Sequence, residues 1–67
     1  MAEGLGNRLK ERRGELGLTQ AELAERCGVT RKTINTVENG VFIPSTLLAL
    51  KLSKALSEPV ENLFWLD

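Results

Sequence analysis

The sequence predicts a compact all-α domain. Leu accounts for 12 residues and Ala for 5, against 4 Val and 2 Ile, and this balance favours helices over pleated strands. Five stretches with helical features follow one another, each set off by a capping residue, a glycine or a proline. At 67 residues the chain has material for one core. We therefore assign residues 1–67 to a single domain.

The first helix is expected from Asn7 to Leu16. Leu9 and Leu16 recur at helical spacing along it, and Gly17 supplies a natural stop. Residues 1–6 contain two glycines and little that can pack, so they are expected to form a frayed lead-in.

The next two helices are marked by their capping residues. Thr19 and Glu22 are spaced so that each side chain can accept from the other's backbone amide, which is a capping box. The second helix then runs from Gln20 to about Cys27 and ends at Gly28, whose missing Cβ permits a left-handed turn. Thr30 caps a third helix, which ends at Asn39-Gly40. Two short helices joined so tightly form a helix-turn-helix over about residues 20–39.

The last two helices follow a proline each. Pro44-Ser45 opens a fourth helix, which extends from Thr46 to about Leu56. Glu58-Pro59 interrupts it and starts a short fifth segment, from Val60 to Leu66. Five short helices with brief connections fit a compact bundle.

Composition excludes several classes of protein. The chain has no His and a single cysteine, Cys27, so we expect no disulfide, no metal site and no cofactor. The usual catalytic constellations are missing too, and we expect no enzyme. No uncharged stretch approaches the ~20 residues that cross a bilayer, and the N-terminus lacks a basic start followed by an apolar run. These features predict a soluble, cytoplasmic protein with no membrane partner.

Net charge does not identify a nucleic-acid binder, because nine basic and nine acidic residues give a formal charge of zero. The local placement of polar groups on the third helix is more informative. At 100° per residue, an arc of roughly 140° opposite Ile34 and Val37 carries no acid. The arc holds Arg31, Lys32, Asn35, Thr36 and Asn39.

This arc favours contact with nucleic acid. Guanidinium, ammonium, amide and hydroxyl groups pair with base edges and phosphates in a major groove, whereas a plain solvated helix face usually mixes both charges. Gln20 starts the second helix, where free amides and the positive end of the dipole favour a phosphate. A plain helix start is the alternative for Gln20.

An extended run of motif residues matches one known family. Leu18-Thr19-Gln20-Ala21-Glu22-Leu23-Ala24, Gly28-Val29-Thr30 and Val37-Glu38-Asn39-Gly40 resemble the phage-repressor and Cro (Xre-type) helix-turn-helix regulators. The similarity extends from about Asn7 to Leu66. It implies a five-helix lambda-repressor-like domain that binds double-stranded DNA as a symmetric homodimer. The helix from Thr30 to Asn39 would then read the major groove.

The resemblance also implies roles for individual residues. Arg31, Lys32 and Thr36 match positions that commonly touch bases in the family, and Gln20 and Asn39 match its phosphate-contacting positions. Thr30 is expected to be both a helix cap and a phosphate ligand. Contacts vary in the family at the other two positions, and we assign Asn35 to a base and Thr33 to a phosphate. Arg13 and Glu38 match a pair that forms a partly buried salt bridge in some members; two separately solvated charges are the alternative.

The loop after the third helix departs from the family pattern. Many members carry a basic residue there, whereas this loop reads Val41-Phe42-Ile43-Pro44. We expect Phe42 to pack on the core. The expected dimer interface consists of Val41, Leu47, Leu63, Phe64, Trp65 and Leu66.

Together these features predict a sequence-specific DNA-binding transcriptional regulator. It would act as a repressor on a near-palindromic operator, with half-sites about 34 Å apart. The alternative is an antitoxin or another protein-interaction module that binds DNA only with a partner protein such as a toxin. An exposed apolar loop would need such a partner.

Overall fold

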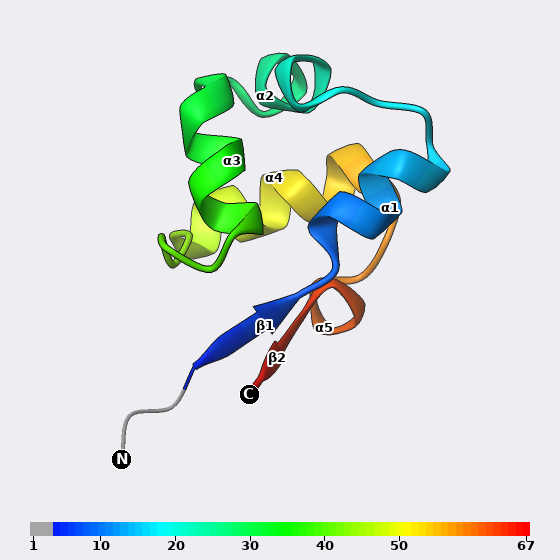
Figure 1. Cartoon of the computed structure of the whole chain (residues 1–67). Helices are drawn as coiled ribbons and strands as arrows, with labels where there is room; N and C mark the ends of the chain where they lie inside the picture. Colours follow the sequence, from blue (N-terminus) through cyan, green and yellow to red (C-terminus); the bar gives the residue numbers. More distant parts are fainter. Residues whose placement is uncertain (1–3) are drawn as a thin grey trace.

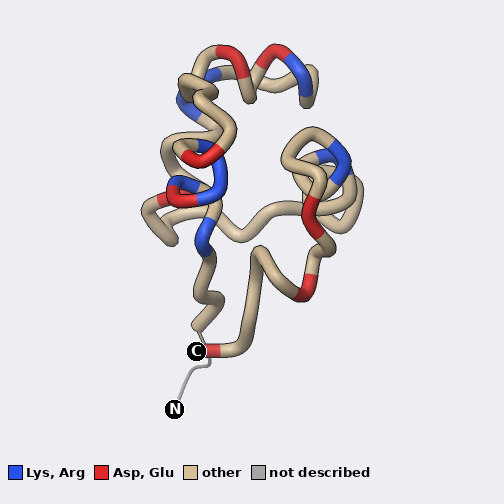
Figure 2. Tube along the Cα trace, turned by 90° about the vertical axis from the view of Figure 1, so that its right-hand side faces the viewer, with Lys and Arg blue, Asp and Glu red and all other residues tan. Residues whose placement is uncertain are grey.

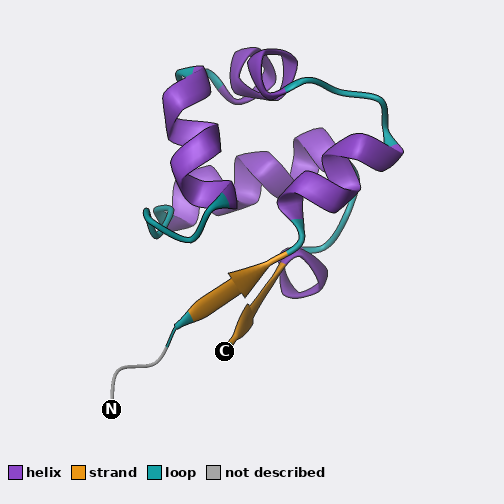
Figure 3. Cartoon of the chain, in the orientation of Figure 1, coloured by secondary structure: helices purple, strands orange, loops and turns teal. Residues whose placement is uncertain are grey.

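The computed structural model describes residues 4–67. Within that range the chain forms five helices and a two-stranded antiparallel ribbon made by its two ends (Figures 1 and 3). The elements are β1 (Leu5–Asn7), α1 (Leu9–Glu15), α2 (Gln20–Cys27), α3 (Arg31–Glu38), α4 (Thr46–Leu56), α5 (Val60–Leu63) and β2 (Phe64–Leu66). The predicted five-helix architecture is confirmed. The bounds of α2, α3 and α4 agree with the prediction to within one residue at each end.

The core is built from one apolar face of each helix. Fully buried leucines come from α1, α2, α4 and α5, and α2 packs against both α3 and α4. The buried hydrophobic residues are Leu9, Leu18, Leu23, Ala24, Cys27, Ile34, Val37, Leu48, Leu52, Leu56, Leu63 and Phe64. Burial of this face is what stabilises helices of eight residues, which are too short to persist alone in water.

Hydroxyl caps start the three central helices where the sequence predicts them. Thr19 Oγ1 accepts from the Glu22 amide at 3.0 Å, Thr30 Oγ1 from the Thr33 amide at 3.2 Å, and Ser45 Oγ from the Leu48 amide at 3.1 Å. Each cap satisfies one of the amides that a helix start leaves without an internal partner.

The chain ends differ from the prediction. Leu5, Gly6 and Asn7 pair in antiparallel register with Leu66, Trp65 and Phe64, respectively. The expected lead-in over residues 1–6 is therefore wrong for the strand residues, and its first three residues lie outside the described range. The first helix begins at Leu9 rather than Asn7, and the fifth ends at Leu63 rather than Leu66.

The ribbon forms where Leu5–Asn7 and Phe64–Leu66 meet from opposite ends of the described chain (Figure 3). The sequence did not predict these strands, because in three residues the hydrophobic periodicity of a strand cannot be distinguished from that of a helix. A Cβ at position 6 would overlap the Trp65 indole, so the ring packs directly on Gly6. Leu5 packs against the core from the same ribbon.

Candidate nucleic-acid interface

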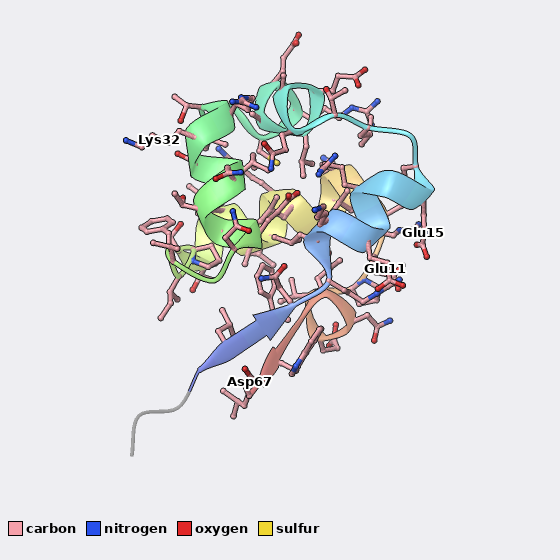
Figure 4. All side chains as sticks on the ribbon, in the orientation of Figure 1. Glu11, Glu15, Lys32 and Asp67 are labelled. Carbon is pink, nitrogen blue, oxygen red and sulfur yellow. The ribbon has the colours of Figure 1, made fainter. Side chains whose placement is uncertain are left out.

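The exposed face of α3 carries the polar arc that the sequence predicts. Arg31, Lys32 and Asn35 are exposed, while Ile34 and Val37 on the opposite side are buried. The first turn of α3 contains no acidic residue. Figure 4 shows Lys32 projecting away from the other helices, with the labelled acids of α1 on the far side of the molecule. This helix therefore presents cationic and amide donors to the outside.

The start of α3 is fixed by hydroxyl groups. Thr30 Oγ1 accepts from the Thr33 amide at 3.2 Å and lies 3.1 Å from Thr33 Oγ1. One turn further on, the Thr36 hydroxyl donates to the Thr33 carbonyl at 2.9 Å. These bonds hold three threonines along one edge of the helix.

The turn between α2 and α3 depends on a glycine. Gly28 has φ 67°, in the left-handed region, and the Val29 amide donates to the Ala24 carbonyl at 3.0 Å. Side chains other than glycine rarely adopt this conformation. The turn leads directly from the end of α2 to the Thr30 cap, which fixes the angle between the two helices.

An ion pair joins α1 to the C-terminal end of α3. Arg13 Nε lies 2.7 Å from Glu38 Oε2, and Arg13 Nη2 donates to Glu38 Oε1 at 3.2 Å. The two side chains are only 14% and 2% exposed. Hydrogen bonding to Glu38 raises the pKa of Arg13 above its ordinary value, against the opposing effect of burial. The structure thus contains the partly buried pair that the resemblance implied.

Gln20 is bonded to this pair. Its Nε2 donates to Glu38 Oε1 at 3.0 Å, which fixes the first residue of α2 against the last turn of α3. The sequence suggested Arg13 with Glu38 but did not reveal this third member, because residues 18 positions apart carry no local spacing signal. Arg13 Nη1 also donates to the Leu18 carbonyl at 2.9 Å, so one guanidinium connects three segments.

Asn7 is a further positioning residue that sequence reasoning missed. Its Nδ2 donates to the carbonyls of Val37 at 3.1 Å and Glu38 at 3.4 Å, both in the last turn of α3. Its Oδ1 accepts from the Leu9 amide at 3.1 Å at the start of α1. One side chain therefore satisfies groups at the ends of two helices.

The last polar residues of the arc contact each other. Asn39 Nδ2 donates to Asn35 Oδ1 at 3.2 Å, and both side chains are exposed. This bond orients the Asn35 amide so that its NH₂ group stays available to an outside acceptor.

The loop after α3 is exposed. Val41 is 78%, Phe42 49% and Ile43 69% exposed, so the expectation that Phe42 packs on the core is wrong. The backbone explains this placement. Gly40 adopts φ 73°, and the Val41 and Phe42 amides both donate to the Thr36 carbonyl, which turns the loop back along α3 rather than inward.

The residues expected at a dimer interface separate into two groups. Leu63 and Phe64 are 0% and 8% exposed, because the chain's own core covers them, and they are not available to a partner. Val41, Leu47, Trp65 and Leu66 are exposed. Leu50, one turn beyond Leu47 on α4, is also exposed and was not singled out from the sequence.

The charges of the chain are interspersed rather than segregated. Figure 2 shows basic and acidic residues close together along the trace, and the loop after α3 carries neither.

No cluster of three or more His, Cys, Asp or Glu side chains in residues 4–67 is placed to bind a metal. Cys27 is buried, and this burial raises the pKa of its thiol. None of the helices within that range is both long and apolar enough to traverse a bilayer.

Comparison with known proteins identifies similar chains over nearly the whole length. The family described as helix-turn-helix matches residues 9–63. The uncharacterised HTH-type transcriptional regulator YgzD of Bacillus subtilis is 48% identical over 61 residues, covering 91% of this chain and 92% of YgzD. An uncharacterised HTH-type transcriptional regulator of Methanothermobacter thermautotrophicus is 53% identical over 60 residues, covering 88% and 87% of the two chains.

Solved structures are similar in fold as well. The restriction-modification controller protein C.AhdI from Aeromonas hydrophila superposes with a TM-score of 0.76 at 35% identity, over 81% of this chain and 82% of C.AhdI. A hypothetical transcription factor from Neisseria, NHTF, gives the same TM-score at 26% identity, over 81% of this chain and 61% of its own.

Proposed function

The chain belongs to the helix-turn-helix family of DNA-binding transcriptional regulators and is not an enzyme; on that premise, we propose that it is a homodimeric repressor. In this proposal α3 enters the major groove of a near-palindromic operator. The two α3 helices of a dimer would read half-sites about 34 Å apart, one helical turn of DNA. Repression would follow from occlusion of a promoter.

The acid-free exposed face of α3 carries the proposal. The bases of the operator would be read by side chains on this face. They are the hydrogen-bond donors of Arg31, Lys32 and Asn35 and the hydroxyl of Thr36. Guanidinium and ammonium groups donate to guanine O6 and N7, and a side-chain amide pairs with adenine N6 and N7. The ion pair at the far end of α3 supports this role, because it ties the helix to α1 and α2 without using any side chain of that face.

Phosphate contacts would position the helix on the duplex. The proposed ligands are Gln20, Thr30, Thr33 and Asn39. Gln20 and Thr30 lie at the starts of α2 and α3, where the first backbone amides lack internal partners and the helix dipole favours an anion. The bond from Gln20 to Glu38 uses one hydrogen of the NH₂ group and leaves the other for a phosphate oxygen.

Dimerisation is proposed through the exposed apolar residues at the end of the bundle. Leu47 and Leu50 share one face of α4, and Leu50 also lines a surface cavity of about 310 Å³ with Pro44, Ala49 and Val60. Leu66 is exposed on the same face of β2 as Phe64 and would extend this surface, whereas Trp65 lies on the opposite face, in a hollow beside Gly14 and Glu38. A two-fold interface would cover the same patch on both copies.

Selection of bound fragments from genomic DNA, with the purified protein at near-physiological salt, tests the proposal. The expected result is an enriched inverted repeat with half-sites one helical turn apart. Binding without an enriched sequence, or no binding, would contradict it and favour a protein that binds DNA only with a partner such as a toxin. Co-purification of a small stoichiometric protein would then identify that partner.

Substitutions on α3 assign the contacts. Arg31→Ala is expected to weaken operator binding by about 1–3 kcal/mol and to relax specificity at one position. Lys54→Ala, at an exposed cation on the last turn of α4, is the matched control and should bind normally. Equal weakening on operator and random DNA would assign Arg31 to a phosphate instead.

Sedimentation tests the dimer separately. The wild-type chain should sediment as a dimer at tens of micromolar, and Leu50→Lys should shift it to monomer because a charge would replace an apolar contact. Leu16→Lys, at an exposed leucine that ends α1, is the control. A wild-type protein that is entirely monomeric would contradict the dimer and leave the DNA proposal to its own test.

A further inference from the structure

The loop that follows α3 lies against the same face of the helix that is proposed to read bases. The Val41 and Phe42 amides donate to the Thr36 carbonyl at 2.9 and 3.2 Å, and the Gly40 amide donates to the Val37 carbonyl at 3.1 Å. This paired pattern is the Schellman motif, which fixes a chain reversal at a helix end. The loop is therefore held in one place relative to α3.

The loop and the helix enclose a surface cavity. It has a volume of about 320 Å³ and is lined by Lys32, Thr33, Thr36, Val41 and Phe42. Three of these residues come from α3, where Lys32 is exposed and Thr33 and Thr36 are half-buried, and the other two are the loop residues that the core leaves uncovered.

The walls of this cavity are mostly apolar, although Lys32, Thr33 and Thr36 from the polar face of α3 contribute to them. The hydroxyls of Thr33 and Thr36 are engaged within α3, with Thr30 Oγ1 and with the Thr33 carbonyl. Val41 and the Phe42 ring provide the rest of the surface, and Lys32 supplies its one charged group. No acidic side chain lines it.

One feature of DNA matches both the apolar wall and the cation. The 5-methyl group of thymine is the apolar group that bases present in the major groove, and the acceptor O4 lies next to it. A lysine ammonium only donates hydrogen bonds, so it suits O4 and disfavours the N4 amino donor that cytosine presents at that place.

We propose that the cavity between α3 and its following loop receives the 5-methyl group of a thymine, with Lys32 donating to O4 of the same base. The loop thereby selects thymine over cytosine at one position of each half-site. This inference rests on the proposed function, since it requires α3 to lie in the major groove. Val41 and Phe42 of the loop then act as specificity determinants.

The test removes the methyl group from the DNA and leaves the protein unchanged. In the selected operator, each thymine is replaced in turn by deoxyuridine, which differs only by the 5-methyl group. We expect one position in each half-site at which the replacement lowers affinity roughly fourfold, the factor for burying one apolar carbon. Specific binding to the operator with no thymine sensitive to this replacement would overturn the inference and leave the proposed function standing.

Protein variants connect the sensitive thymine to the cavity. Val41→Ser and Phe42→Ser replace exposed loop residues, and each should bind the thymine and deoxyuridine operators with nearly equal affinity. Ile43→Ser changes the next exposed loop residue, which does not line the cavity, and should retain the fourfold difference. Retention of that difference in both Val41→Ser and Phe42→Ser would overturn the inference.

Discussion

The two ends of α3 are held by different kinds of contact. At its start, the Thr30 hydroxyl accepts from Thr33 within the same turn, and the neighbouring Arg31 and Lys32 are exposed. At its end, Glu38 and the last carbonyls are bonded to side chains from α1, α2 and β1. The exposed Arg31 and Lys32, which are proposed to contact bases, therefore lie on a helix whose position is set mainly by contacts of its last turn, about 9 Å beyond Lys32 at 1.5 Å per residue.

The starts of α2 and α3 differ in one informative way. Both begin with a threonine cap, but the residue three positions on is Glu22 in α2 and Thr33 in α3. The Glu22 carboxylate accepts from the Thr19 amide at 2.9 Å and completes a capping box. The start of α3 lacks this second bond, because Thr33 has no carboxylate. The face of α3 proposed to bind DNA therefore carries no negative charge at this position.

Removing the charge of Glu38 is expected to have the largest effect on stability. In Glu38→Gln the Arg13 guanidinium, only 14% exposed, loses its counter-charge, and the free energy of unfolding should fall by about 3 kcal/mol. Urea unfolding followed by circular dichroism measures this change. Glu25→Gln, at an exposed site on α2, is the control. A loss below about 1 kcal/mol would indicate that the pair behaves as an exposed one.

Truncation of Asn7 should lower the free energy of unfolding, because its side chain bonds to backbone carbonyls at the same end of α3. Asn7→Ala leaves the carbonyls of Val37 and Glu38 and the amide of Leu9 without this partner, at a cost of about 1–3 kcal/mol. Asn62→Ala removes an exposed bond to Glu58 and serves as the comparison in the same unfolding assay. Equal losses in the two variants would mean that Asn7 has no special role at the helix ends.

At the other end of α3, the cap itself can be removed. Thr30→Ala should destabilise the domain by about 1 kcal/mol, because the Thr33 amide loses its acceptor. Thr30→Ser keeps a hydroxyl at the cap and should restore most of that loss. Failure of serine to rescue would attribute the effect to packing of the threonine methyl group.

Exchange of the third residue of α3 separates stability from binding. Thr33→Glu should complete a capping box with Thr30 and raise the free energy of unfolding by about 0.5 kcal/mol, through favourable interaction with the helix dipole. The same carboxylate should weaken operator binding by repelling phosphates. Thr33→Gln has the same length without the charge and should bind more tightly than Thr33→Glu. Indistinguishable affinities would place Thr33 away from the DNA.

The smallest expected effect is the pH dependence of the α2 cap. Hydrogen bonds from the Thr19 backbone amide and hydroxyl lower the pKa of Glu22 below its ordinary value. A carboxyl with a lowered folded pKa contributes stability above its unfolded pKa of about 4.3, and that contribution is lost as the pH falls through the folded value. Glu22→Gln should therefore melt slightly below wild type at pH 7, with the difference shrinking toward pH 3. A difference between Glu22→Gln and wild type that stays constant as the pH falls below about 4.3 would contradict this prediction.

The sequence by itself determined the helices and most of the exposed arc. Thr19, Thr30 and Ser45 cap helices where their spacing predicts, and Gly28 turns the chain, because capping and left-handed turns depend on residues a few positions apart. The polar and apolar sides of α3 also follow from its period alone. The pair of Arg13 with Glu38 came from the family resemblance, and the structure gives it geometry.

Only the tertiary structure decided the contacts between distant residues. The pairing of β1 with β2, the bonds from Asn7 to the end of α3 and the bond from Gln20 to Glu38 join segments 18 or more residues apart. No local period encodes such contacts, since they depend on how the helices pack. Packing likewise buried Leu63 and Phe64 and left Phe42 exposed, because one filled core and a fixed chain reversal determine which apolar side chains find room inside.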